Sequence, residues 1–286
     1  MSRVASSLAL IRLLLPMLRL AAVPLPAQAA EPANARSDAR IDVPTSARQG
    51  EMVIGRVPPG SQVALAGRQL RVAPEGWFVF GFGRDAGEPA ALAVQFPDGR
   101  QAKANVAVQA RDWRIERVDG LPPSTVSPNP ELQARIAREQ AGVVKARERD
   151  DARSDFLTPL TWPVRGRISG VYGSQRILNG APRNPHYGLD VAAPEGTPLH
   201  APAPGVVTFA DAGLYLTGGT LTLDHGHGIS STFIHLSRLD RQVGDRVEQG
   251  QVIGAVGATG RATGPHMHWG MNWFEVRLDP QLLLPD

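Results

Sequence analysis

Short apolar runs separated by turn residues dominate the chain from residue 41 onward. In the first half, apolar and polar positions alternate over 52–54, 62–65, 77–80 and 92–94, with turn sequences such as Pro58-Pro59-Gly60 between them. Alternation with a period of two, bounded by Pro and Gly, is typical of half-buried strands. Residues 41–120 are therefore predicted to form an N-terminal β-sandwich domain.

The pattern changes between residues 121 and 157. A Pro-rich stretch precedes a segment dense in Ala, Arg, Glu and Gln, where Leu132, Ile136 and Val143 lie near helical spacing. Asn129 before Pro130 suits an N-cap followed by proline at the first helical position. We predict a Pro-rich and helical linker over 121–157, whose charged face is either solvated or in contact with a protein partner.

Many short strands separated by glycine are again predicted from residue 158 to 286. The strand-like runs are 167–169, 206–209, 220–223, 231–234 and 252–256. Strands this short, at this spacing, favour a compact antiparallel sheet or sandwich. The predicted fold class of the whole chain is therefore mainly β, with a second β domain over 158–286.

The first 29 residues are typical of an export signal. They contain Arg3, Arg12 and Arg19 but no acidic residue, an apolar stretch over 13–23, and Ala27-Gln28-Ala29, which fits a signal-peptidase site. We expect a signal peptide at 1–29, a short tether at 30–40, and an exported protein that resides in the periplasm. No other stretch approaches the roughly 20 apolar residues that span a bilayer, so the mature protein is expected to have no membrane span.

Composition excludes two classes of function. The net charge of +3 comes entirely from that signal segment, because without its three arginines 27 basic residues face 27 acidic ones. The balance does not support a nucleic-acid partner. The chain has no cysteine, so it holds no disulfide, thiolate metal ligand or thiol nucleophile, and any metal must be bound by His, Asp or Glu.

The seven histidines all lie in the second half, and two clusters of them suggest a metal site. His186 and Asp190 are four residues apart, about 13 Å in a straight strand, so a bend near Gly188 is needed to bring them to one ion. His266 and His268 alternate with an apolar residue and so face the same side of a strand, about 6.6 Å apart. One can bind a metal while the other stays free, and two His, one Asp and an open position are typical of catalytic zinc.

These clusters, taken with other motifs, resemble the LytM/lysostaphin family of zinc endopeptidases. The resemblance covers roughly residues 162–285 and is carried by an ordered set of motifs. They are Trp162-Pro163-Val164, Val171-Tyr172-Gly173, His186-x-x-x-Asp190, His235-Leu236-Ser237, the run from Gly244 to Gly254, Gly257-Ala258-Thr259-Gly260 and His266-x-His268.

The resemblance implies an enzyme, a zinc metalloendopeptidase that hydrolyses peptide bonds in peptidoglycan stem peptides or cross-links. It implies one Zn²⁺ per chain with His186, Asp190 and His268 as ligands, and His235 and His266 as the catalytic pair. The fold that it implies is a β-rich groove with the metal on its floor. The sequence departs from shorter relatives over 176–185, which we interpret as a longer loop forming a wall or lid of that groove.

Several alternatives remain beside this interpretation. Some relatives lack metal ligands and regulate other wall hydrolases, so the alternative function is a non-catalytic or autoinhibited cell-wall-binding regulator; the complete residue set here favours the enzyme. His200 and His227 are interpreted as structural. His225 is interpreted as shaping a tight turn or lining the groove, with support of the metal site through its pairing with Asp224 as the alternative. The run over 244–254 also resembles a biotinyl carrier hairpin, but the only lysines, Lys103 and Lys145, lie upstream of it. An envelope protein partner is expected to bind through the N-terminal domain or the linker helix.

Overall fold

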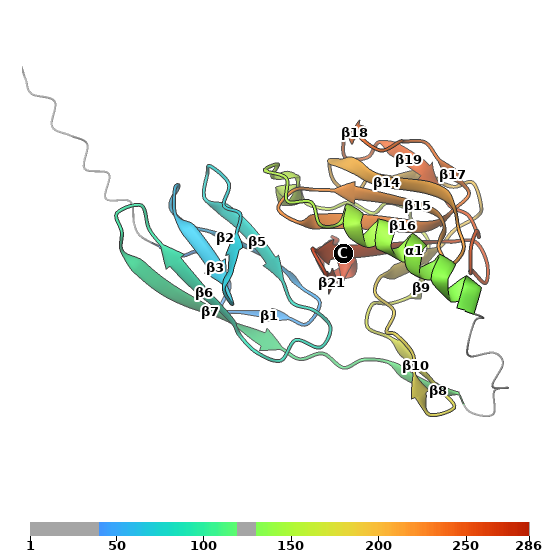
Figure 1. The fold of residues 1–286 in the computed structure, drawn as a ribbon, viewed down its shortest axis with the longest axis horizontal. Helices are drawn as coiled ribbons and strands as arrows, with labels where there is room; N and C mark the ends of the chain where they lie inside the picture. The colour runs from blue at the N-terminus through green and yellow to red at the C-terminus, as the bar shows by residue number, and fades with distance from the viewer. Residues whose placement is uncertain (1–39, 119–129, 286) are drawn as a thin grey trace, which may run out of the picture. The chain divides into compact units, whose positions relative to one another are not determined.

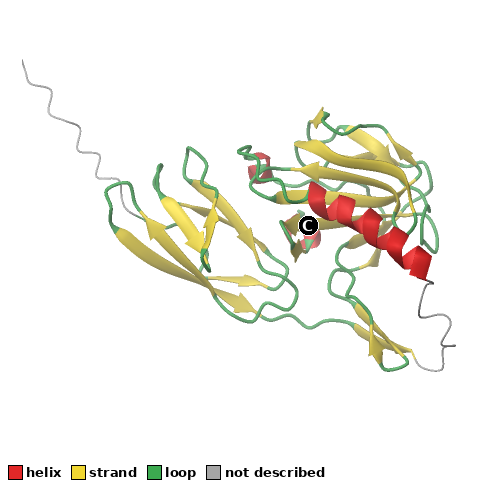
Figure 2. Ribbon diagram, viewed as in Figure 1, coloured by secondary structure: helices red, strands yellow, loops and turns green. Residues whose placement is uncertain are grey.

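A computed structural model describes residues 40–118 and 130–285, and strands are its main regular element (Figures 1 and 2). The described residues belong to one compact unit. The prediction of a mainly β protein is confirmed. The predicted signal peptide and, apart from Arg40, the tether lie outside the described residues, and the boundaries placed at 120 and 157 stay predictions.

The strands of the first half form two sheets. They are β1 (Ser46–Arg48), β2 (Met52–Arg56), β3 (Gln62–Leu65), β4 (Arg68–Leu70), β5 (Trp77–Gly81), β6 (Ala90–Gln95) and β7 (Gln101–Gln109). One sheet has the order β1-β7-β6-β3-β4, and β2 pairs with β5 in the other. Along β6 buried and exposed residues alternate strictly, as the sequence pattern predicted.

The second half is built on an eight-stranded antiparallel sheet. Its strands are β9 (Arg167–Gly170), β12 (Leu189–Ala192), β14 (Gly205–Leu214), β15 (Gly218–Asp224), β16 (Ile229–Leu236), β18 (Arg246–Val247), β20 (His266–Trp273) and β21 (Val276–Leu278). The order is β18-β14-β15-β16-β20-β12-β9, with β21 on β20. A smaller sheet joins β13 (Pro198–His200), β19 (Val252–Ala255) and β17 (Arg238–Leu239).

One face of the large sheet packs against the hydrophobic core, so the side chains that alternate with the core residues lie on the opposite face. Leu221, Phe233, Trp269 and Leu189 are neighbours in one cross-strand row, and none of them is exposed. The rings of Phe233 and Trp269 stack with their centres 5.9 Å apart. Because successive residues of a strand point to opposite faces, the row beside this one turns away from the core.

The predicted helix is present as α1 (Pro130–Ala146), with a 3₁₀ turn, η2 (Asp155–Leu157), further along. α1 lies against β14 (Figure 1), and a Glu139 carboxylate oxygen accepts a hydrogen bond from the Tyr215 N–H at 2.8 Å. After α1 the chain is fixed to β15 by an ion pair between Arg153 and Asp224. No helix among residues 40–118 and 130–285 combines the length and apolar character that crossing a membrane requires.

The segment predicted as a loop over 176–185 is largely a small hairpin. β10 (Gln175–Leu178) pairs with β11 (Ala181–Pro182), and it also pairs in parallel with β8 (Ile115–Val118). No local pattern could predict the pairing with β8, because β8 lies about 60 residues earlier in the chain than β10. A second 3₁₀ turn, η3 (Pro280–Leu283), follows the last strand.

Candidate metal centre

The central strand β20 carries both histidines of the His-x-His motif on one face. Met267 and Trp269, which alternate with them, are fully buried in the core. His268 is paired with Asp190 of β12 on one side and with Ile234 of β16 on the other. Paired residues of an antiparallel sheet face the same side, so the pairing itself brings the Asp190 carboxylate beside His268.

Three side chains converge at this point. His186 lies three residues before β12, and its Nε2 atom is 3.1 Å from Asp190 Oδ1 and 3.0 Å from His268 Nδ1. The third side of the triangle, His268 Nδ1 to Asp190 Oδ1, measures 2.8 Å. Among the described residues, these three side chains form a group whose ligand atoms are close enough to hold one metal ion.

Zinc suits this donor set. In a tetrahedral site with bonds of about 2.0–2.1 Å the ligand atoms are about 3.3 Å apart, so the triangle would need to open by only a few tenths of an ångström. The His186 Nδ1–H donates to the Val171 carbonyl oxygen at 3.0 Å, which leaves the Nε2 lone pair directed at the other two donors. Two imidazoles and one carboxylate are also the ligand types that zinc prefers.

Gly188 is required for this convergence. A Cβ atom at residue 188 would lie 2.6 Å from His268 Cε1 and Nε2, and 2.7 Å from the Trp269 carbonyl oxygen. The backbone of Gly188 does not have a positive φ, so its role is clearance for the His268 ring rather than an unusual turn. The predicted bend is present, but the physical reason for the glycine differs from the one expected.

The Asp190 carboxylate is held in its charged form. Burial by itself would raise its pKa, but the close polar contacts with the His186 and His268 rings outweigh burial and move the pKa well below its ordinary value. A permanently ionised carboxylate contributes one negative charge toward balancing a divalent cation.

His235 and His266 lie beside the ligands, with their ring centres 4.8 Å apart. The ring centre of His235 is 6.5 Å from that of His268. The His235 Nδ1–H donates to the Thr259 carbonyl oxygen and the His266 Nδ1–H to that of Gly264, each at 2.8 Å. Burial lowers the pKa of His235 to about 4, so its ring is neutral at pH 7 and Nε2 keeps a free lone pair.

The other three histidines form no part of this cluster. His225 is buried, with Nδ1 bonded to the Pro204 carbonyl oxygen and Nε2 to the Ser231 hydroxyl, at 2.7 and 2.9 Å. His227 packs its ring on Phe156, and His200 donates to the Gly250 carbonyl oxygen. All three have structural contacts, in agreement with the sequence-based interpretation.

Sequence reasoning missed the groups that orient the site histidines. These are the carbonyl oxygens of Val171, Thr259 and Gly264, each bound to a histidine Nδ1. Any residue type offers a backbone carbonyl, so side-chain identity carries no signal for it. Val171 and Thr259 do lie in the Val-Tyr-Gly and Gly-Ala-Thr-Gly motifs, but the motifs did not indicate that their carbonyl oxygens orient histidines.

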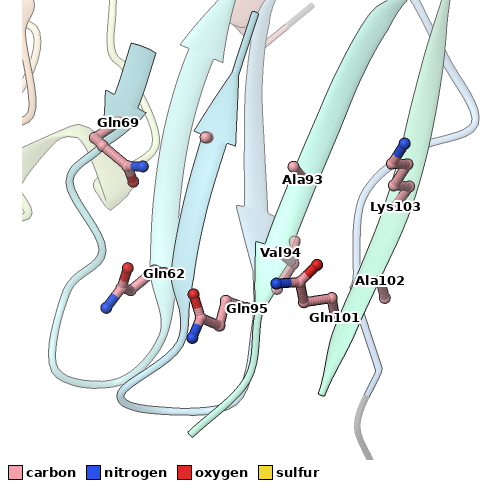
Figure 3. A pocket seen from close by; sticks show the side chains of 9 residues that line it. Gln62, Gln69, Ala93, Val94, Gln95, Gln101, Ala102 and Lys103 are labelled. Carbon is pink, nitrogen blue, oxygen red and sulfur yellow. The ribbon is translucent and has the colours of Figure 1, made fainter. Parts of the chain in front are cut away.

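A pocket on the first half of the chain has a different character. It lies over β3, β6 and β7, where glutamine side chains and Lys103 surround an alanine surface (Figure 3). Its lining contains no His, Asp or Glu and therefore none of the ligands that zinc takes in a protein without cysteine. Among residues 40–118 and 130–285, the group of side chains close enough to hold a metal ion is the one around His268.

Comparison with known proteins places this cluster in a family. Residues 184–280 match Peptidase family M23. The "DD-carboxypeptidase/endopeptidase Mpg" of Neisseria meningitidis is 43% identical over 101 residues, which cover 35% of this chain and 22% of that protein. The "Peptidoglycan DD-endopeptidase ShyA" of Vibrio cholerae is 38% identical over 111 residues, 38% of this chain and 26% of that protein. The chain thus matches about a quarter of the length of these curated relatives.

A solved structure extends the similarity over most of the chain. It is described as a putative peptidase M23 from Pseudomonas aeruginosa, and it is 31% identical with a TM-score of 0.62. The similarity covers 82% of this chain and 93% of the solved one. On the strength of this near-complete match and of the motif-bearing segment over 184–280, the chain belongs to peptidase family M23.

Proposed function

We propose that this chain is a zinc metalloendopeptidase that hydrolyses peptide bonds in peptidoglycan stem peptides or cross-links. The observation that carries the proposal is the triangle of ligand atoms from His186, Asp190 and His268, all within 4.8 Å of one another. The name of the ShyA relative, a peptidoglycan DD-endopeptidase, supports the substrate. Membership of a peptidase family supports the reaction.

In this proposal His186 Nε2, Asp190 Oδ1 and His268 Nδ1 hold one Zn²⁺. When bound, zinc lowers the pKa of a coordinated water and polarises the scissile carbonyl. The Val171 carbonyl oxygen fixes the tautomer of His186, and the strand pairing fixes Asp190 against His268. These contacts keep three donors aimed at one point without large movement on binding, which is the arrangement that tight metal affinity requires.

His235 and His266 move the protons. Each commits Nδ1–H to a carbonyl oxygen, so each presents an Nε2 lone pair for a proton in the reaction. One histidine takes the proton of the attacking water, and the other hydrogen-bonds the developing oxyanion or helps to protonate the leaving amine. At the end of the reaction the carbon–nitrogen bond is broken, the acid carries the water oxygen and the amine carries the proton.

The remaining elements of the proposal concern the whole protein. We propose that residues 1–29 direct export, that the enzyme acts in the periplasm, and that residues 158–286 form its peptidase domain. The β domain over 41–120, or the helix of the linker over 121–157, is proposed to bind an envelope protein.

The experiment measures bound zinc and the release of soluble muropeptides from purified peptidoglycan. It compares wild type with His268→Ala, His235→Ala and the control His200→Ala, whose ring bonds Gly250 outside the site. Wild type is expected to hold one zinc and to cleave. His268→Ala should lose both, His235→Ala should keep zinc and lose cleavage, and the control should keep both.

Two outcomes would overturn the proposal. Wild type that binds zinc but cleaves nothing, including defined cross-linked peptides, would point to the regulatory alternative. Cleavage by His268→Ala at the wild-type rate without bound metal would show that the chemistry does not depend on this centre.

A further inference from the structure

His235 is held in an unusual backbone conformation at the end of β16. Its φ is 66°, in the left-handed region that residues with a side chain seldom adopt. The His235 N–H donates to the Thr217 carbonyl oxygen at 2.8 Å, and its ring Nδ1–H donates to the Thr259 carbonyl oxygen at 2.8 Å. Since such conformations persist only where the surroundings enforce them, two separate loops fix both the backbone and the ring.

Thr259 connects these two loops through its side chain. Its hydroxyl donates to the Leu236 carbonyl oxygen at 2.9 Å and accepts from the Gly219 N–H at 2.9 Å. Leu236 follows His235 directly, and Gly219 belongs to the start of β15. A single hydroxyl therefore ties the loop that carries the Thr259 carbonyl to β16, the strand that contains His235, and to the neighbouring strand β15.

Two glycines let the backbone pack closely around this hydroxyl. A Cβ atom at Gly218, where φ is 59°, would lie 2.1 Å from Thr259 Oγ1. A Cβ atom at Gly257 would lie 2.7 Å from the His235 carbonyl oxygen. The glycines of the Leu-Thr-Gly-Gly-Thr hairpin and of the Gly-Ala-Thr-Gly loop let the two backbones approach closely enough for the hydroxyl to bridge them.

We propose that Thr259 is a positioning residue for His235: its hydroxyl anchors the loop whose carbonyl oxygen keeps the imidazole in the Nδ1–H tautomer with Nε2 facing the metal ligands. The effect on rate rests on the proposed peptidase function, but the effect on the tautomer does not. Thr259 itself touches neither the ligand triangle nor the reacting atoms in this assignment. It acts only through His235.

The test compares Thr259→Val, which removes the hydroxyl at nearly constant shape, with Thr259→Ser, which keeps it. Thr222→Val is the matched control, because Thr222 also has a hydroxyl bonded within the same sheet, to Thr232 at 3.1 Å, with no contact to His235. The ¹⁵N shifts of the histidine rings in the zinc-loaded protein report the tautomer. Steady-state kinetics on a soluble cross-linked peptide report kcat and KM.

Thr259→Val should turn the His235 ring into a mixture of tautomers and lower kcat by about ten- to a hundredfold, with KM changed less than about twofold. Thr259→Ser should restore the single tautomer and most of kcat, and Thr222→Val should match wild type. Bound zinc should be equal in all four proteins. If Thr259→Val does not fold, Thr259→Ala beside Thr259→Ser gives the same comparison.

The inference is overturned if Thr259→Val keeps the single Nδ1–H tautomer, or if Thr222→Val lowers kcat to the same extent. If wild type cleaves no peptide, the proposed function fails, while the ¹⁵N spectra of the variants still decide whether the hydroxyl holds the ring.

Discussion

Replacing Gly188 with alanine is expected to damage the metal centre without unfolding the protein. The new methyl group would stand 2.6 Å from two atoms of the His268 ring and 2.7 Å from the Trp269 carbonyl oxygen. That oxygen belongs to a residue paired with Leu189 inside the sheet, so it cannot retreat easily. The imidazole of His268 is the group that must move.

The size of the movement sets the expected loss. Carbon and nitrogen atoms in ordinary contact are about 3.5 Å apart, so the ring must shift by about 1 Å. Ligand positions in metal sites are held to about 0.2 Å. A shift several times larger should weaken zinc binding by about ten- to a hundredfold, or about 1.4–2.8 kcal/mol.

The assay is competition for zinc between the protein and a chelator of known affinity. Gly264→Ala is the control, since a Cβ atom there meets nothing within 4 Å although the residue is only two positions from His266. Thermal unfolding in excess chelator should give similar transitions for the two variants. A zinc affinity of Gly188→Ala within about twofold of wild type would refute the assignment of His268 as a closely packed ligand.

Three further outcomes are expected. Burial lowers the pKa of His225 from 6.5 to about 4, so the unfolded chain binds a proton at a higher pH than the folded chain does. The contribution of His225 to the free energy of unfolding is therefore complete above pH 6.5, and about 3 kcal/mol of it is lost as the pH falls to 4. Urea unfolding of His225→Gln should show a flatter pH dependence than wild type. Phe233→Ala, in the core row, should cost about 3–5 kcal/mol in the same measurement, whereas Tyr215→Ala, at a side chain that is 43% exposed, should cost much less. Chelation of zinc should lower the melting temperature, and added zinc should restore it; an unchanged melting temperature would contradict a folded-state metal site.

Local pattern was enough to place the second half of the site. The alternation His266-Met267-His268-Trp269 predicted one strand with two histidines on one face, and β20 has this arrangement because Met267 and Trp269 enter the core. The resemblance to a family added which histidine of the pair to expect as a ligand. The strands over 52–54, 62–65 and 206–209 were likewise marked by their own residues.

The rest depended on contacts between distant parts of the chain. Spacing alone showed that His186 and Asp190 need a bend, but the clearance at Gly188 follows from the position of His268, 80 residues later. The carbonyl oxygens of Val171 and Thr259 orient imidazoles without any side-chain signal. Such features arise from strand register and loop packing, which a local pattern does not contain.

The pairing of β8 with β10 bears on whether the metal centre is a separable module. β10 is the first strand of the hairpin that leads to His186, and the His186 N–H donates to the carbonyl oxygen of Ser174, the residue just before that strand. Its parallel partner, β8, ends at Val118, more than 40 residues before Trp162. A fragment that starts at Trp162 would retain all three proposed ligands and both proposed catalytic histidines, yet the segment before His186 would lose its neighbouring strand β8. We therefore expect the smallest unit that preserves the candidate metal centre to be longer than the segment that carries the family motifs.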